Sequence, residues 1–199
     1  TISENQADLA GGGVVNISVN GIARFSSINS TLSSNFVDGN GGGLFNEVTS
    51  NGNAIANITH STFNNNSGGN IYNKNGNIYV NHSIIANAPG GNLDCENIGG
   101  SVSSGGFNLV EDGTCGFASG GDPVLGDLTN NGGNTLTHAL QPGSPALDAI
   151  PPAQCGSTYD QRHIQRPFGA GCDIGAFELD TITIEFEQNV NDQNVIPGQ

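Results

Sequence analysis

The sequence has few basic residues: 4 Lys and Arg stand against 18 Asp and Glu among 199 residues, which gives a formal net charge of −14. Four cations cannot form a basic face, so electrostatic capture of nucleic acid or of an anionic membrane is disfavoured. The chain also lacks Met and Trp. No apolar run approaches the roughly 20 residues that a membrane-spanning helix needs. We therefore expect no nucleic-acid partner and no membrane span in this chain.

Glycine, by contrast, is abundant. The 31 glycines among 199 residues are about twice the usual share of roughly 7%. The apolar residues are mostly Val, Ile, Leu and Phe in short bursts, which suits thin β layers better than amphipathic helices. An ordinary helical or α/β domain is therefore disfavoured.

The four cysteines fall into two local pairs, Cys95 with Cys115 and Cys155 with Cys172. The sequence has neither a Cys-x-x-Cys motif nor histidines at zinc-ligand spacing, so two disulfides are the better interpretation. Each would constrain the unfolded chain by about 3 kcal/mol in the chain-entropy model. Since disulfides persist in oxidising compartments, the pairs predict a secreted or cell-surface protein. The alternative is four reduced, buried cysteines in a cytosolic protein.

An internal repeat organises the first half of the chain. The segment Gly-Gly-Gly-Val-Val-Asn at residues 11–16 recurs as Gly-Gly-Gly-Leu-Phe-Asn at 41–46 and in shorter form at 69–73. A second element recurs in step with it, at residues 29–35, 60–66 and 82–87. Periods of this length are typical of solenoids, and the apolar residues alternate as they do in strands. The sequence therefore predicts stacked parallel strands.

In such a coil, equivalent residues of successive turns lie about 4.8 Å apart, so like side chains form ladders along the stack. Gly and Asn suit the corners because both tolerate a positive φ. Leu44 and Phe63 are predicted to point inward, whereas Arg24 and Lys74 are predicted to be solvated. The alternative is a disordered Gly/Asn-rich tract, but the aliphatic positions recur in register.

The sequence divides the domain into three parts. Residues 1–121 hold the repeats, which fade from about residue 92. Residues 122–178 contain six of the eight prolines and predict an ordered, irregular cap that covers the end of the solenoid. Residues 179–199 contain a final alternating strand and a polar tail.

Residues 92–178 carry an ordered series of motifs that resembles the choice-of-anchor Q domain. The motifs are Asp-Pro-Val-Leu-Gly-Asp-Leu at 122–128, Asn-Gly-Gly-Asn-Thr-Leu-Thr-His-Ala-Leu at 131–140, Pro-Gly-Ser-Pro-Ala-Leu-Asp-Ala at 142–149, Asp-Gln-Arg at 160–162, Arg-Pro at 166–167 and Cys-Asp-Ile-Gly-Ala-Phe-Glu at 172–178. The repeats themselves look loosely like those of polymorphic outer-membrane proteins. His163-Ile164 departs from the Gly-aliphatic pair that the first resemblance leads us to expect.

The resemblance implies a right-handed parallel β-helix of pectate-lyase-like shape, on secreted or surface proteins of bacteria whose attachment device varies. It implies no enzymatic activity. Because no catalytic motif belongs to the resemblance, the departure at His163 bears only on the local loop.

Charged residues concentrate in the cap. Arginine forks that bind carboxylates and carbonyls would cross-link an irregular loop, so we interpret these residues as a structural staple. The alternatives are a catalytic role or a Ca²⁺ site. We expect no metal and no cofactor. The six residues are Asp148, Asp160, Arg162, Arg166, Asp173 and Glu178.

A carbohydrate-active enzyme, either a polysaccharide lyase or a hydrolase, is the alternative function. Between residues 11 and 90 the only acids are Asp38 and Glu47, and the only cations are Arg24 and Lys74. These cannot form a laddered catalytic set of paired carboxylates on one face. His60 and His82 occupy similar places in two repeats, and we expect them to stack on the surface rather than to bind a metal.

The sequence thus favours a non-enzymatic extracellular structural or adhesion protein, with a surface glycan and a second copy of itself as candidate partners. An uncovered rung of a β-helix recruits a further strand. One prediction is that the alternating strand beyond the cap pairs head to tail with a neighbouring copy and so extends a filament. The alternative is that this strand folds back on its own coil, which would leave a monomeric adhesin module. The residues of the strand are Thr181, Ile182, Thr183, Ile184, Glu185, Phe186 and Glu187.

Overall fold

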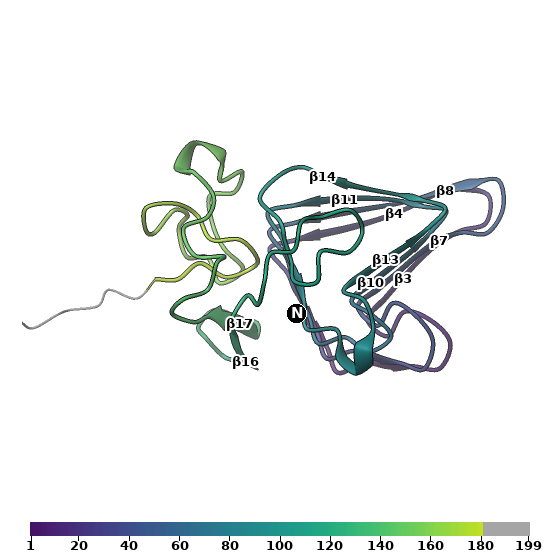
Figure 1. Ribbon diagram of the computed structural model, residues 1–199, viewed down its shortest axis with the longest axis horizontal. Coiled ribbons are helices and arrows are strands. Elements are labelled where there is room, and N and C mark those ends of the chain that lie inside the picture. The colour runs from purple at the N-terminus through teal and green to yellow at the C-terminus, as the bar shows by residue number, and fades with distance from the viewer. Residues whose placement is uncertain (181–199) are drawn as a thin grey trace, which may run out of the picture.

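The computed structural model describes residues 1–180. This part of the chain is all-β, and residues 1–110 wind into a right-handed parallel β-helix of about four turns, as predicted (Figure 1). The strand expected at residues 181–187 lies outside the described residues. Among residues 1–180, no helix has the length and apolar character needed to cross a membrane.

Each turn of the coil contributes strands to three stacked walls. The first wall contains β1 (Ile2–Ser3), β5 (Thr31–Ser33), β9 (Thr62–Asn64), β12 (Ile84–Ala86) and β15 (Leu109–Val110). The second contains β3 (Val14–Ser18), β7 (Leu44–Val48), β10 (Ile71–Lys74) and β13 (Cys95–Ile98). The third contains β4 (Gly21–Ile28), β8 (Gly52–Thr59), β11 (Asn77–Asn81) and β14 (Ser101–Ser104). A short pair, β2 (Gln6–Ala7) and β6 (Phe36–Val37), forms one corner.

Register follows the sequence repeat. Leu44 pairs with Ile71, which pairs in turn with Cys95, so the inward apolar positions stack directly above one another. The interior contains a continuous apolar cluster in which Leu44 and Phe63 are both 0% exposed, as predicted. Since the hydrophobic contribution scales with apolar area removed from water, this column of side chains is the main stabilising feature of the coil.

Polar side chains also stack inside the coil. Asn16, Asn46, Asn73 and Asn97 hold the same position in β3, β7, β10 and β13. Each Nδ2 donates to the Oδ1 of the next asparagine, at 2.7 Å in every step. We call this row the inner amide ladder. A one-residue slip of any turn would break it, so it fixes the register of the stack.

Positive φ values recur at the corners on both sides of the first wall. Asn29, His60 and His82 precede successive strands with φ of 44°, 44° and 51°. Glycine has a different use at residue 42, where a Cβ atom would lie 2.0 Å from the carbonyl oxygen of Ser67. The Gly-rich motif is thus required where adjacent turns approach backbone to backbone.

The coil continues where the sequence repeat fades. β13, β14 and β15 pair in parallel with β10, β11 and β12 of the preceding turn. The short η1 helix (Pro89–Gly91) leads into this turn. The Cys95–Cys115 disulfide is formed, and Cys115 and Phe117 pack against the interior of the last turn. The chain after β15 therefore covers the core at this end of the coil.

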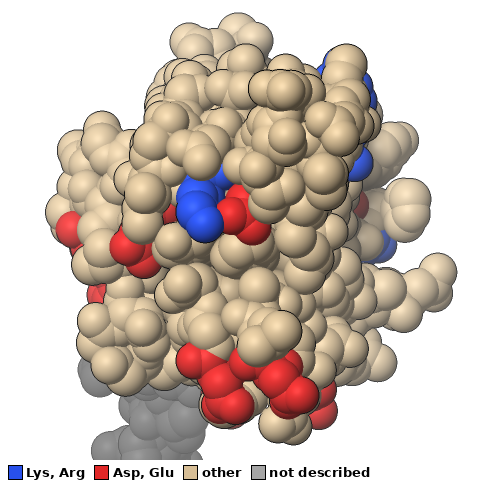
Figure 2. All heavy atoms as spheres, turned by 90° about the vertical axis from the view of Figure 1, so that its right-hand side faces the viewer, with Lys and Arg blue, Asp and Glu red and all other residues tan. Residues whose placement is uncertain are grey.

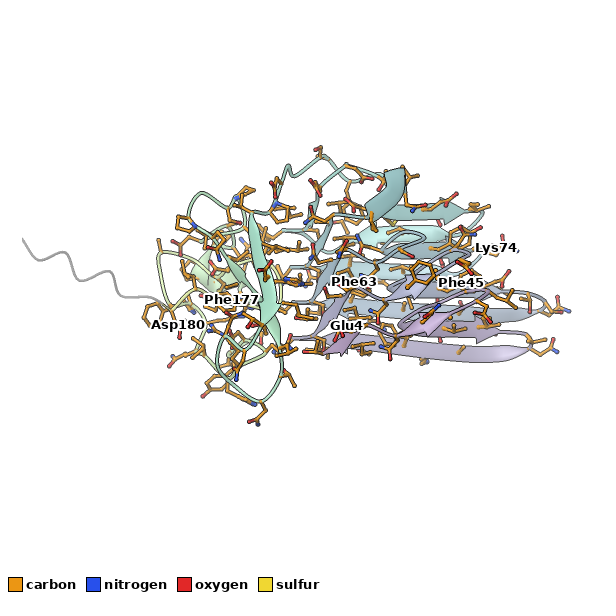
Figure 3. All side chains as sticks on the ribbon, turned by 90° about the horizontal axis from the view of Figure 1, so that it is seen from below. Glu4, Phe45, Phe63, Lys74, Phe177 and Asp180 are labelled. Atoms are coloured by element: carbon orange, nitrogen blue, oxygen red, sulfur yellow. A yellow bond between two sulfur atoms is a disulfide. The ribbon has the colours of Figure 1, made fainter. Side chains whose placement is uncertain are left out.

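The C-terminal lobe, which we define as residues 122–180, lies beside the coil rather than over its end (Figures 1 and 3). The irregular, disulfide-containing C-terminal segment is present as predicted, but, contrary to our expectation from the sequence, it does not cover the end of the solenoid. The lobe contacts the outer face of the first wall through bonds such as Thr31 Oγ1 to Gln161 Oε1 at 2.7 Å and Ala176 N to Thr62 Oγ1 at 3.1 Å. The lobe holds an antiparallel pair, β16 (Leu125–Thr129) with β17 (Thr137–Leu140), the η2 helix (Pro152–Gln154) and the predicted Cys155–Cys172 disulfide.

This lateral position explains why the strands of the first wall are buried on both faces. Phe63 and Ile85 point into the coil, whereas Ile84 and Leu109 point outward into a second apolar cluster. That cluster is completed by lobe residues, including Phe177. The first wall therefore separates two hydrophobic clusters, one inside the coil and one between coil and lobe.

Replacement of Leu44 or Phe63 by Asp is expected to unfold the coil, because burial of an unpaired charge costs several kcal/mol, comparable with the total stability of a domain. Arg24→Ala is the matched control, since Arg24 is exposed on β4 and its loss is expected to be nearly neutral. Circular dichroism melts measure both effects. Unchanged melting of the Asp variants would contradict the repeat register.

Candidate functional site

The charged residues of the lobe meet in a buried cluster, which we call the arginine hub. Arg166 Nη1 donates to Glu178 Oε2 at 2.7 Å, and both side chains are almost fully buried. The same guanidinium donates to the carbonyl oxygens of Asp173 and Gly175, each at 2.7 Å. One arginine thus ties together three points of an irregular backbone.

A second arginine extends the hub. Arg162 Nε donates to Asp160 Oδ2 at 2.9 Å, and its Nη2 donates to the carbonyl oxygen of Glu178. The guanidinium also lies 3.7 Å from the centroid of the Phe177 ring. Asp160 in turn accepts the backbone N–H groups of Ile164 and Glu178. Arg162 is therefore held on its edge by a carboxylate and on its face by an aromatic ring.

Backbone N–H groups satisfy the remaining carboxylates. Asp173 accepts from the N–H groups of Asp148 at 2.7 Å and Leu179 at 2.6 Å, and Asp148 accepts from Gly171 at 2.8 Å. Burial raises the pKa of Asp173 and of Glu178, while Arg166 and backbone N–H bonds act in the opposite direction, from Asp148 and Leu179 for Asp173 and from Asp173 and Phe168 for Glu178. All six residues named from the sequence lie in one bonded network, so its chemistry is that of a structural cross-link.

The histidines predicted to stack on the surface are instead buried between coil and lobe. The rings of His60 and His82 do lie against each other, with centroids 4.7 Å apart and planes tilted by 35°, but the lobe covers them. His60 Nε2 lies 2.5 Å from the carbonyl oxygen of Cys155. The sequence thus predicted the contact between the two rings but not their burial, because it did not predict the lateral position of the lobe.

His138 was not singled out from the sequence, yet it joins the same contact. It lies on β17 and is buried against the first wall. Its Nε2 lies 2.8 Å from Ser33 Oγ and 3.2 Å from Asn64 Nδ2, and its Nδ1 lies 2.7 Å from the carbonyl oxygen of Gly126. The only sequence signal was its place in the motif at residues 131–140.

A second row of amides runs along the corner that precedes the second wall. It begins at Asn5 and ends at the buried carboxylate of Asp94, which accepts from Asn70 Nδ2 at 3.0 Å. Burial raises the pKa of Asp94 to about 6. Asp94 also accepts the N–H groups of Ala88 and Asp112. The full row is Asn5, Asn35, Asn66, Asn70 and Asp94.

Asp94 borders an open pocket of about 700 Å³ that also contains Glu111 and Asp112. Sequence reasoning missed this carboxylate, although its place just before β13 matches that of Asn70 before β10. Nowhere in residues 1–180 do three or more His, Cys, Asp or Glu side chains gather in a way that could hold a metal ion.

The outer face of the third wall carries many short polar side chains, together with Ile55 and Arg24, which lie in register with Asn77. Asn77 is joined to Asn53 and to Ser101 by hydrogen bonds of 2.8 and 2.7 Å. A neighbouring row contains Asn57 and Tyr79, in register on β8 and β11, and the Tyr79 side chain is 50% exposed. At the corner opposite the lobe, Figure 2 shows a surface on which charged side chains are few. Lys74 and Glu47 form a pair there at 2.7 Å, and Figure 3 places Lys74 far from the lobe.

Replacement of Arg166 by Met is expected to destabilise the lobe by about 3–5 kcal/mol, because Glu178 would be left buried without its cationic partner. Arg24→Met is the matched control at an exposed position. Chemical denaturation of both variants measures the difference. Equal stability of the two variants would show that the hub contributes nothing to the fold.

Comparisons of this chain with protein-family models, with curated proteins and with solved structures found no match.

Proposed function

We propose that this is a non-enzymatic structural or adhesion protein of the bacterial cell exterior, and that it contacts glycans through the outer face of the third wall. The observation that carries the proposal is the exposed ring of Tyr79 beside the hydrogen-bonded side chains of Asn53, Asn77 and Ser101 on that face. The motifs that resemble the choice-of-anchor Q domain support an exported protein of this kind.

The outer face suits a sugar for physical reasons. Its amides and hydroxyls are held by neighbours within the wall, as Asn77 is held between Asn53 and Ser101, so little side-chain entropy remains to be lost on binding. An exposed aromatic ring such as Tyr79 offers an apolar surface with a polar edge. A pyranose has the same two features, apolar C–H faces and a rim of hydroxyls.

The disulfides support an extracellular compartment. Both bonds join cysteines close in sequence, Cys95 to Cys115 and Cys155 to Cys172, and the described residues contain no free cysteine. Such bonds are consistent with an extracellular protein, because they persist under oxidising conditions. The composition supports the same conclusion, since the chain has only 4 basic residues.

Between residues 11 and 90 the enzymatic alternative lacks a suitable pair of acids, whereas Asp94, Glu111 and Asp112 line the pocket of about 700 Å³ and are the acids to replace first in a test of this alternative. Glu47 is engaged by Lys74 at 2.7 Å, and Asp38 lies at the opposite end of the second wall, before β7 begins. The acids of the lobe are occupied by the arginine hub. A screen for sugars released from pectin-like and alginate-like polysaccharides tests this alternative directly, and release that is lost on replacement of one acid would favour it.

Tyr79→Ala is expected to weaken binding to a responsive glycan by roughly tenfold, which corresponds to the ~1–1.5 kcal/mol contributed by an aromatic contact. Tyr159→Ala is the matched control, because that ring is 48% exposed, close to the 50% of Tyr79, but lies in the lobe. A glycan array followed by calorimetry on the best ligand provides the measurement. Equal losses in both variants, or no binding to any glycan, would contradict a glycan site on the third wall.

We also propose that copies of the chain associate head to tail. Within residues 1–180, β3 and β4 of the first turn each pair on one side only. The inner amide ladder has complementary ends. At the first turn, Asn16 donates to Asn46 of the next turn, and its own Oδ1 accepts from no other turn. At the last turn, Asn97 Nδ2 donates only to Gly100 within its own turn. The segment over the last turn restricts coil-on-coil contact, so the strand predicted at residues 181–187 is the favoured connector.

Deletion of residues 181–199 is expected to abolish association, and association of the full chain is expected to strengthen with salt, since the net charge of −14 opposes contact between copies. Light scattering across salt concentrations measures the mass of both proteins. An oligomer that survives the deletion would reject the connector, and a full chain that stays monomeric at every salt concentration would reject association itself.

A further inference from the structure

Three of the four histidines of the chain lie where the lobe meets the first wall. His60 and His82 belong to the coil, whereas His138 belongs to β17 of the lobe. All three are buried, and none lies in the arginine hub. Histidine is the side chain whose charge changes most readily between about pH 5 and 8, so this contact collects the groups most sensitive to mild acid.

The contact with Asn64 favours a neutral His138 ring. Its Nδ1 faces the carbonyl oxygen of Gly126 at 2.7 Å, so Nδ1 carries the proton and Nε2 is the acceptor. That acceptor faces the Nδ2 donor of Asn64 at 3.2 Å, and the Oδ1 of the same amide accepts from Asn87 Nδ2 at 2.8 Å. A second proton on Nε2 would face this amide donor and would leave only the Ser33 hydroxyl, at 2.8 Å, as its acceptor.

His60 is neutral for a related reason. Its Nε2 faces the Cys155 carbonyl oxygen at 2.5 Å and therefore carries the proton. Its Nδ1 is buried with no hydrogen-bond partner among the described residues. A proton added there would place a positive charge with no acceptor within reach, directly beside the stacked ring of His82.

We propose that the lobe is a pH-sensitive lid on the first wall: protonation of His60, His82 and His138 in mild acid releases it from the coil, while coil and lobe each keep their own fold.

The charged groups around these histidines mainly oppose their protonation while the lobe is docked. From the lobe, Arg166 adds repulsion to a proton on His60 or on His82, and the two rings repel each other when charged. Burial lowers the pKa of His60 to about 3 and also lowers the pKa of His82 and of His138. Asp127, on β16 beside His138, favours the charged ring, but burial outweighs it.

The sign follows from linkage. In the docked state the lobe contacts the first wall, and in the released state it does not. A histidine whose pKa is lower in the docked state than in the released state stabilises docking fully above its pKa in the released state, 6.5, and progressively less below that pH. For His60, whose docked pKa is about 3, each pH unit in this window reduces the docking constant about tenfold. Between about pH 6.5 and pH 4.5 this amounts to roughly 100-fold from one residue.

Two carboxylates act in the opposite sense. The pKa values of Asp173 and Glu178 are raised by burial, so their protonation in acid favours the docked state. Both belong to the arginine hub within the lobe, and their bonds to Arg166 and to backbone N–H groups do not cross to the coil. The disulfide Cys155–Cys172 also lies within the lobe, so release does not require the lobe to unfold.

Hydrogen–deuterium exchange of the full chain at about pH 7 and about pH 4.5, corrected for intrinsic exchange rates, tests the lid. The amides of Gly175 and Ala176, which donate across to the coil, are expected to lose protection at least 100-fold in acid, whereas those of β7 and β10 keep theirs. The double variant His60→Gln/His138→Gln should keep its protection in acid, because glutamine can donate and accept without titrating. His163→Gln, at an exposed histidine of the lobe, is the matched control and should behave as the unaltered chain.

Three results would overturn the proposal. They are full protection of Gly175 and Ala176 in acid, equal acid losses in the double variant and the unaltered chain, and simultaneous loss in β7 and β10, which would mean global unfolding. If the double variant does not fold at neutral pH, NMR titration of the histidine rings in the unaltered chain decides instead: values near the usual 6.5 for His60 and His138 would also overturn it.

Discussion

In-register stacking of parallel turns is the constraint on which the rest of this structure depends. Each turn can satisfy its backbone only against the turn before and after it, so every side chain sits above its counterpart one repeat away. An asparagine repeated in this way, as at Asn46, forms a hydrogen bond to both neighbours. A buried amide that would be costly alone is therefore stabilising in a row. The same rule lets one apolar position per strand build a continuous core.

The stacking rule leaves three outer faces, and the molecule uses them differently. The lobe covers the first wall through apolar contacts of Ile84 and Leu109 and through polar contacts of Thr31 and Ser33. On the second wall, the outward rings of Phe45 and Tyr72 stack and are almost fully buried. The third wall keeps its outward asparagines and Tyr79 in contact with water. The third wall thus keeps hydrogen-bonded polar side chains and an exposed ring at the surface, which is why we propose recognition there.

The sequence predicted the parallel coil, the inward positions Leu44 and Phe63, and both disulfides, because these follow from local periodicity and from cysteine spacing. It did not predict where the lobe docks. Docking depends on contacts between residues more than 100 positions apart, such as Ser33 with His138, and no repeat encodes them. The burial of His60 escaped prediction for the same reason. The fourth turn was partly hidden because β14 is built of serines and one valine, which pair through the backbone and need no apolar repeat.

The distribution of charge reflects the difference between the regular coil and the irregular lobe. The arginines at 162 and 166 are buried in the lobe, which has no repeat to supply order and is held by ion pairs, N–H bonds and a disulfide. The coil has one disulfide, Cys95–Cys115, and one ion pair, Lys74–Glu47, but its turns are held mainly by backbone ladders and stacked amides. Two of the four cations of the chain are thus buried in the irregular lobe, and the 18 acids outnumber the 4 cations to give the net charge of −14. Within residues 1–180, the contact between coil and lobe has neither stacked turns nor ion pairs across it, and consists of an apolar cluster, neutral polar hydrogen bonds and three buried histidines, of which the histidines are the groups most sensitive to a proton.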